Sequence, residues 1–144
     1  MISESRLKDA ERLVRITMIL ILLTAGTSKL FSEGGFFEYY SQLFQGDLRI
    51  NLSPLLVNFY LTIIPFIEIL IGLALLSNKN KIYAVYGWFI FMLTLLFGHY
   101  ILQEWSAVNQ MLSYIFLGLL CLILPNHSFW FSRDVLSEKA SLEN

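Results

Sequence analysis

Long apolar segments, separated by short polar stretches, make up most of this sequence. Four of them reach or approach the ~20 residues that a membrane-spanning helix needs. They cover residues 13–31, 54–76, 82–102 and 107–124. The pattern predicts an all-α fold, an integral membrane four-helix bundle in one domain over residues 1–144. Residues 1–12 and 125–144 are expected to be tails outside the membrane.

Local signals agree with these boundaries. Ser53 and Pro54 form an N-cap followed by proline at the first helical position. The polar run "SNKNK", residues 77–81, predicts a tight turn between the second and third spans. Pro125 ends the fourth span, since proline cannot continue a helix.

The connection between the first and second spans has a helical pattern of its own. In "GFFEYYSQLFQG" the apolar positions recur at i, i+1, i+4, i+7 and i+8, which is one face of a helix. Those positions are Phe36, Phe37, Tyr40, Leu43 and Phe44. We expect a short amphipathic outer helix that lies on the bundle or on the membrane surface. It acts either as a plain cover for helix ends or as a gate over a site.

The distribution of cations predicts the orientation. Lysines and arginines are concentrated in both tails and in the 77–81 turn. They are Arg6, Lys8, Arg12, Arg15, Lys79, Lys81, Arg133 and Lys139. The positive-inside rule then places both termini in the cytoplasm of a bacterial-type plasma membrane. Acidic residues in the N-terminal tail count against the alternative, a cleaved signal peptide.

Composition supports the membrane assignment and excludes several functions. The chain is 56% hydrophobic and 15% charged, whereas soluble domains have roughly 25% charged residues. A net charge of -1 offers no basic surface for nucleic acid. The single cysteine, Cys121, cannot form an internal disulfide. His99 and His127 belong to opposite sides of the membrane, so we expect no metal site.

Five polar side chains inside or at the edge of the spans are the candidate site, because such residues are costly in lipid. Lys29, His99 and Asn109 fall at similar heights and predict a cluster in the outer half. Glu68 lies deeper, and either Lys29 or Arg15 is expected to pair with it. We assign proton exchange to Glu68 and substrate binding to Lys29, His99, Asn109 and Arg15. The alternative is a structural role, in which these pairs hold helices together.

The same residues carry a family resemblance. Four stretches in this order resemble the DoxX-like membrane proteins: "R…LLTAGTSKLF", "IPFIEILIGLALL", "GHY" and "VNQML". The second stretch and the aromatic outer loop resemble the MauE branch, which is associated with methylamine dehydrogenase maturation. The resemblance implies a four-helix membrane bundle linked to redox work, such as a small subunit of a thiosulfate:quinone oxidoreductase. With Cys121 as its only thiol, the chain does not match the cysteines often found in that branch.

Three functions remain open from the sequence. The first is a redox-associated subunit that binds a quinone or a similar small molecule inside the bundle, with no covalent cofactor. The second is a non-catalytic assembly or scaffold protein for an extracytoplasmic redox partner. The third is a small transporter component, which would need a homo-oligomer. The expected partners are the lipid bilayer and a redox protein.

Overall fold

The structure is a computed structural model that describes residues 3–31, 35–46, 48, 50 and 52–125. Most of the predicted tail at 125–144 lies outside these residues. Helices are the only regular elements in the described part of the chain. They are α1 (Glu4–Phe31), α2 (Phe36–Phe44), α3 (Pro54–Ala74), α4 (Lys81–Ile101) and α5 (Trp105–Ile123). The predicted all-α bundle of four long helices and one short outer helix is confirmed.

The four long helices have the surface of a membrane protein. Each is long and apolar enough to cross a bilayer. Large apolar side chains point outward from all of them, including Leu20, Phe66, Leu70, Ile90, Leu93 and Phe116. A soluble protein would bury such residues, whereas in a bilayer they contact acyl chains. The chain is therefore a multi-pass membrane protein in contact with lipid.

Helix α1 begins at Glu4, nine residues before the apolar segment that predicted it (13 − 4). Its first turns are polar but still helical, because charged side chains four residues apart support them. Lys8 lies 3.0 Å from Glu4, and Arg15 lies 3.2 Å from Glu11. Apolar periodicity alone therefore underestimates the length of this helix.

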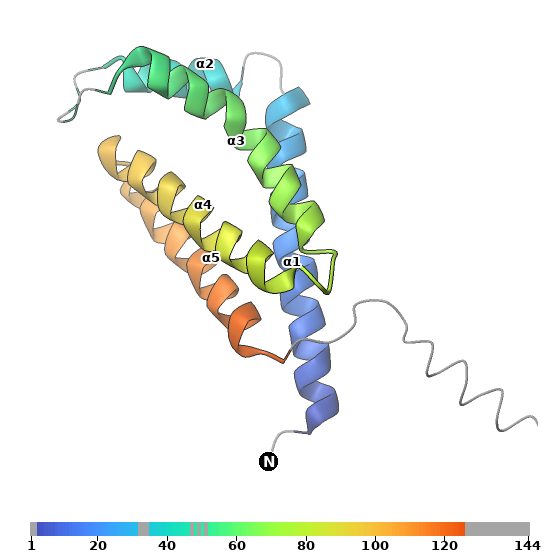
Figure 1. Ribbon diagram of the computed structural model, residues 1–144. Helices are drawn as coiled ribbons and strands as arrows, with labels where there is room; N and C mark the ends of the chain where they lie inside the picture. The colour runs from blue at the N-terminus through green and yellow to red at the C-terminus, as the bar shows by residue number, and fades with distance from the viewer. Residues whose placement is uncertain (1–2, 32–34, 47, 49, 51, 126–144) are drawn as a thin grey trace, which may run out of the picture.

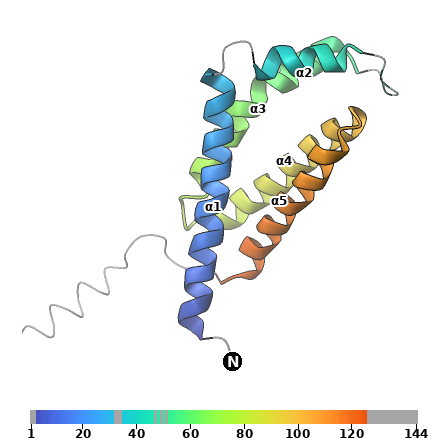
Figure 2. The ribbon, with the colours of Figure 1, turned by 180° about the vertical axis from the view of Figure 1, so that it is seen from behind.

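The helices lean apart toward one end of the bundle. The most extensive helix contacts are those of α1 with α3 and of α4 with α5 (Figures 1 and 2). From the N-terminus of α1 upward, α4 and α5 tilt away from α1, and α2 lies across the far end with the first half of α3 (Figure 1). We call this far end the α2 end.

Helix α3 is bent along its length (Figure 1). Pro65 lies inside it and has no N–H to donate to the carbonyl of Leu61, which is a recognised cause of helix bending. Beyond the bend, α3 packs closely on the end of α1. A Cβ atom on Gly26 would lie 2.8 Å from the Pro65 carbonyl oxygen and 3.2 Å from Glu68 Cβ. The turn that carries Glu68 thus lies beside the last turns of α1.

A second glycine, on the α3 side of this interface, also permits close packing. A Cβ atom on Gly72 would lie 3.0 Å from Leu23 Cδ2 and 3.3 Å from Leu22 Cβ. Small residues let membrane helices pack at short range, where dispersion and polar contacts are strongest. The two glycines therefore allow α1 and α3 to pack closely at Glu68 and one turn beyond it.

Candidate functional site

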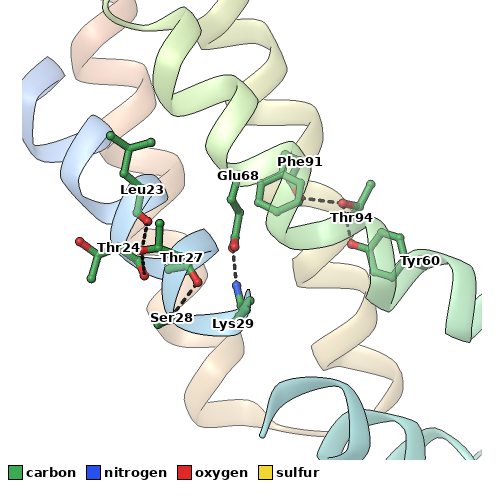
Figure 3. Close-up of polar contacts among 10 residues, drawn as sticks. Leu23, Thr24, Thr27, Ser28, Lys29, Tyr60, Glu68, Phe91 and Thr94 are labelled. Carbon is green, nitrogen blue, oxygen red and sulfur yellow. Dashed lines mark hydrogen bonds and ion pairs between the residues drawn. The ribbon is translucent and has the colours of Figure 1, made fainter. Parts of the chain in front are cut away.

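Glu68 and Lys29 form an ion pair between α3 and α1 (Figure 3). Lys29 Nζ donates a hydrogen bond to Glu68 Oε1. The Glu68 side chain is only 3% exposed and that of Lys29 is 19% exposed. The ammonium also lies 5.0 Å from the ring centroid of Phe36, close enough for a cation–π contact. Of the two predicted partners for Glu68, the structure brings Lys29 to it.

The second carboxylate oxygen of Glu68, Oε2, differs from the first in its hydrogen bonding. Oε2 is buried and has no hydrogen-bond partner among the described residues. A buried polar oxygen without a partner costs free energy, so such atoms often mark a place that a ligand or water completes. Glu68 therefore has one oxygen bonded to Lys29 and one buried oxygen without a hydrogen bond among the described residues.

A cavity of about 240 Å³ adjoins this pair, and we call it the chamber. All five helices contribute to its wall. Its polar lining residues are Lys29, Tyr40, Glu68, His99, Gln110 and Tyr114. The remaining lining residues are apolar, among them Phe36, Met92 and Leu95. A mostly apolar wall with a few converging polar groups is typical of small-molecule sites.

His99 enters the chamber wall from α4 and is held on its other side by Glu104. Its Nδ1 lies 2.6 Å from Glu104 Oε2. The connection between α4 and α5 makes this possible, because Gln103 adopts a left-handed φ of 57° and reverses the chain sharply. The backbone N–H of Glu104 donates to the carbonyl of His99 at 3.0 Å.

Tyr40 covers the chamber from α2. Its ring centroid lies 5.9 Å from that of His99, in an edge-to-face arrangement. Burial raises the pKa of the Tyr40 phenol above its ordinary value, and the nearby Glu104 carboxylate raises it further. The hydroxyl therefore stays protonated near neutral pH and can act as a hydrogen-bond donor.

The structure does not bring Asn109 into this group. Asn109 does not line the chamber, whereas the next residue, Gln110, does, although both residues are exposed on α5. Successive residues on an α-helix point about 100° apart, so a one-residue error in register exchanges a lining side chain for an outward one. The predicted position of Asn109 along the helix axis did not give the direction in which its side chain points.

Arg15 also lies outside the chamber, near the end of the bundle opposite α2. It is fully buried, 3.2 Å from Glu11, and it donates to Asn78 at 3.0 Å. Lys81 lies 2.9 Å from the same Glu11 carboxylate and donates to the carbonyl of Leu124. We call Glu11, Arg15, Asn78 and Lys81 the inner cluster. It ties α1 to the α3–α4 turn and to the end of α5.

Several of these residues were missed at the sequence level. Glu11 and Lys81 fall in the predicted tail and the predicted turn. The four-residue spacing of Glu11 and Arg15 nevertheless indicates an ion pair on a helix. Glu104 belongs to a short link, and only the reversal at Gln103 places it against His99. Within the described residues, no group of three or more His, Cys, Asp or Glu side chains could hold a metal ion.

Comparison with protein families agrees with this architecture. The family model described as methylamine utilisation protein MauE matches residues 8–113. The chain belongs to the MauE family. The match confirms the resemblance to DoxX-like, MauE-type membrane proteins. Comparisons with curated proteins and with solved structures give no significant match.

The matched range of this MauE-family chain contains both polar groups described above. It includes the Lys29–Glu68 pair and the His99–Glu104 pair, as well as α2. It also includes all four residues of the inner cluster, and the match ends within α5. The chamber is therefore built almost entirely from the part of the chain that defines the family.

Proposed function

We propose that this MauE-family protein is a redox-associated membrane subunit that binds the head of a quinone in the chamber. The observation that carries the proposal is the Lys29–Glu68 pair in the wall of a cavity, in which Glu68 Oε2 is buried and has no hydrogen-bond partner among the described residues. A carboxylate held in this way at the edge of an apolar chamber is suited to exchanging a proton with a bound molecule.

The chemistry of the lining supports a quinone head. A quinone presents two carbonyl oxygens, which accept hydrogen bonds, on a flat apolar ring. Lys29 and Tyr40 offer donors, and Phe36, Met92 and Leu95 offer apolar contact. Glu68 balances the charge of Lys29, and Glu104 lies against Nδ1 of His99. Such a site favours a neutral polar head over an ion.

Two groups of the chain are placed to move protons. Reduction of a quinone to a quinol takes up two electrons and two protons, which is the chemistry the ligand supplies. Glu68 Oε2 is the atom that gives or takes a proton inside the chamber. His99 and Glu104 extend from the chamber toward the α2 end, where the Glu104 side chain is partly exposed. The electrons come from a redox protein partner.

The orientation follows from the cations, as the sequence predicted. Both termini lie in the cytoplasm of a bacterial-type plasma membrane, and the α2 end is extracytoplasmic. In this arrangement Glu104 exchanges protons with the outer side, and a redox partner docks there.

Replacing Glu68 by Gln tests the proposal. We expect the Kd for menadione, a naphthoquinone head without a tail, to rise at least about tenfold, because Gln cannot hold Lys29 as a charged partner. Equilibrium binding to the purified protein in mild detergent measures this. Glu38→Gln is the matched control, since it makes the same change on an exposed residue of α2. Menadione binding that is absent from the wild type, or equal in the wild type and Glu68→Gln, would refute the proposal.

A second candidate is a membrane accessory protein without a ligand, which is compatible with the family description. The Lys29–Glu68 pair joins α1 to α3 and could act only as a fastener. In that case Glu68→Gln lowers the thermal stability of the protein or the yield of its complex, and menadione shifts neither property.

A further inference from the structure

A second hollow lies between α3 and α4, on the side of the bundle that faces lipid. Its volume is about 450 Å³, within the ~300–1,000 Å³ typical of ligand sites. Outward-facing side chains form its rim, and Leu56, Ile90, Leu93 and Phe97 are more than half exposed. The bend in α3 carries its first half away from the bundle axis here (Figure 1). We call this hollow the groove.

The groove suits a hydrocarbon chain. None of its lining residues is charged. Its two hydroxyl groups are already paired, since Tyr60 donates to Thr94 at 2.8 Å and Thr94 donates to the carbonyl of Phe91 at 2.7 Å (Figure 3). A polar head would find no unpaired partner there, whereas an apolar chain would lose no hydrogen bond on entering.

A narrow hollow of about 30 Å³ lies next to both the groove and the chamber. It shares Phe36, Tyr40 and His99 with the chamber. It shares Phe44, Tyr60 and Gly98 with the groove, and we call these three residues the neck. The shared lining residues place the three hollows next to one another, in order from a polar interior site to the lipid face.

We propose that the groove binds the prenyl tail of the quinone whose head occupies the chamber, so that the ligand is a long-tailed membrane quinone entering sideways from the bilayer. The inference rests on the proposed function and adds the class of quinone and its route. One molecule with a polar head and a long apolar tail matches the order of the three hollows.

A phospholipid acyl chain is the competing occupant of the groove. Its phosphate needs a positive charge that is not already balanced, but no cation lines the groove, and the Glu68 carboxylate balances the charge of Lys29 in the chamber. A neutral quinone head needs no such partner. The charges around the path therefore favour the quinone.

Gly98 is the point at which the path can be closed. A Cβ atom added there would lie 3.8 Å from Phe44 Cζ, which is ordinary van der Waals contact. Alanine therefore leaves the neck open, and leucine fills it. Leu93→Trp narrows the groove from a lipid-facing position, and Leu70→Trp makes the same change on an exposed part of α3 that does not line the groove.

The experiment compares menadione with a menaquinone that carries four isoprene units, in the wild type and the four variants. Partition into detergent cancels when the same quinone is compared between proteins. We expect Gly98→Leu and Leu93→Trp to raise the Kd of the menaquinone about tenfold, since the tail loses its buried apolar contact. The Kd of menadione should stay the same, and Gly98→Ala and Leu70→Trp should change neither value.

The outcomes separate the two proposals. If menadione binds but all five proteins hold the menaquinone equally well, the groove inference is wrong and the chamber remains. A phospholipid that native mass spectrometry finds bound, and that menaquinone does not displace, also overturns the groove inference. If menadione does not bind to the wild type, the proposed function fails and the groove inference fails with it.

Discussion

A carboxylate inside an apolar span is stable only when something compensates the cost of removing it from water. At Glu68 the compensation is incomplete, because Lys29 satisfies one oxygen and the other is buried without a hydrogen-bond partner among the described residues. In the inner cluster one carboxylate, Glu11, serves two cations, Arg15 and Lys81. We propose that the first arrangement serves a ligand, whereas the second uses its charges to hold helices together.

The inner cluster should therefore matter for stability and not for binding. Glu11→Gln leaves Arg15 and Lys81 buried without a carboxylate, so we expect the free energy of unfolding to fall by about 3 kcal/mol. Reversible denaturation in mixed micelles measures this loss. Glu4→Gln is the control, because Glu4 pairs with Lys8 at the surface, where such pairs contribute little. Equal stability of Glu11→Gln and wild type would show that the cluster is not structural.

Sequence reasoning identified the residue types of the site better than their directions. Glu68, Lys29 and His99 stood out because ionisable residues in apolar spans are rare. Asn109 was chosen by height along α5, but the lining residue is Gln110, and one residue of helix rotation separates the two. Glu104 could not be found at all, since its place depends on the left-handed turn at Gln103.

At the scale of the helix, contact between α1 and α3 decides whether Lys29 reaches Glu68. Counting residues along straight helices placed Glu68 about 10 Å in height from Lys29. Helix α3 is bent at the level of Pro65, and the side chains of Lys29 and Glu68 form an ion pair. Gly26 permits this approach, because no side chain stands between the two backbones there.

Gly26→Ala should consequently disturb both stability and binding. Its Cβ would lie 2.8 Å from the Pro65 carbonyl oxygen, and backbone cannot move aside cheaply. We expect a loss of about 1–3 kcal/mol in unfolding free energy and a weaker affinity for menadione. Gly87→Ala is the matched control, since its nearest neighbour would be 3.7 Å away and alanine favours helix. If Gly26→Ala matches Gly87→Ala in both measurements, the close approach has been misjudged.

At the scale of the whole molecule, the proposed function depends on the separation of α4 and α5 from α1 at the α2 end. Helices α4 and α5 lean away from α1, and α2 lies across that end of the bundle with the first half of α3 (Figures 1 and 2). Hydrophobic patterning predicted the four spans and the amphipathic character of α2, because burial in lipid sets both. The tilt and the bend arise from side-chain packing between helices, which apolar periodicity does not encode. The chamber, neck and groove were therefore beyond reach of the sequence.

Native mass spectrometry of the protein released from mild detergent tests the central claim most directly. Wild-type protein purified from a membrane that contains quinone should carry one quinone per chain, and Glu68→Gln should carry much less while remaining folded. Wild-type protein that emerges without quinone, or Glu68→Gln that retains as much as the wild type, would contradict the account.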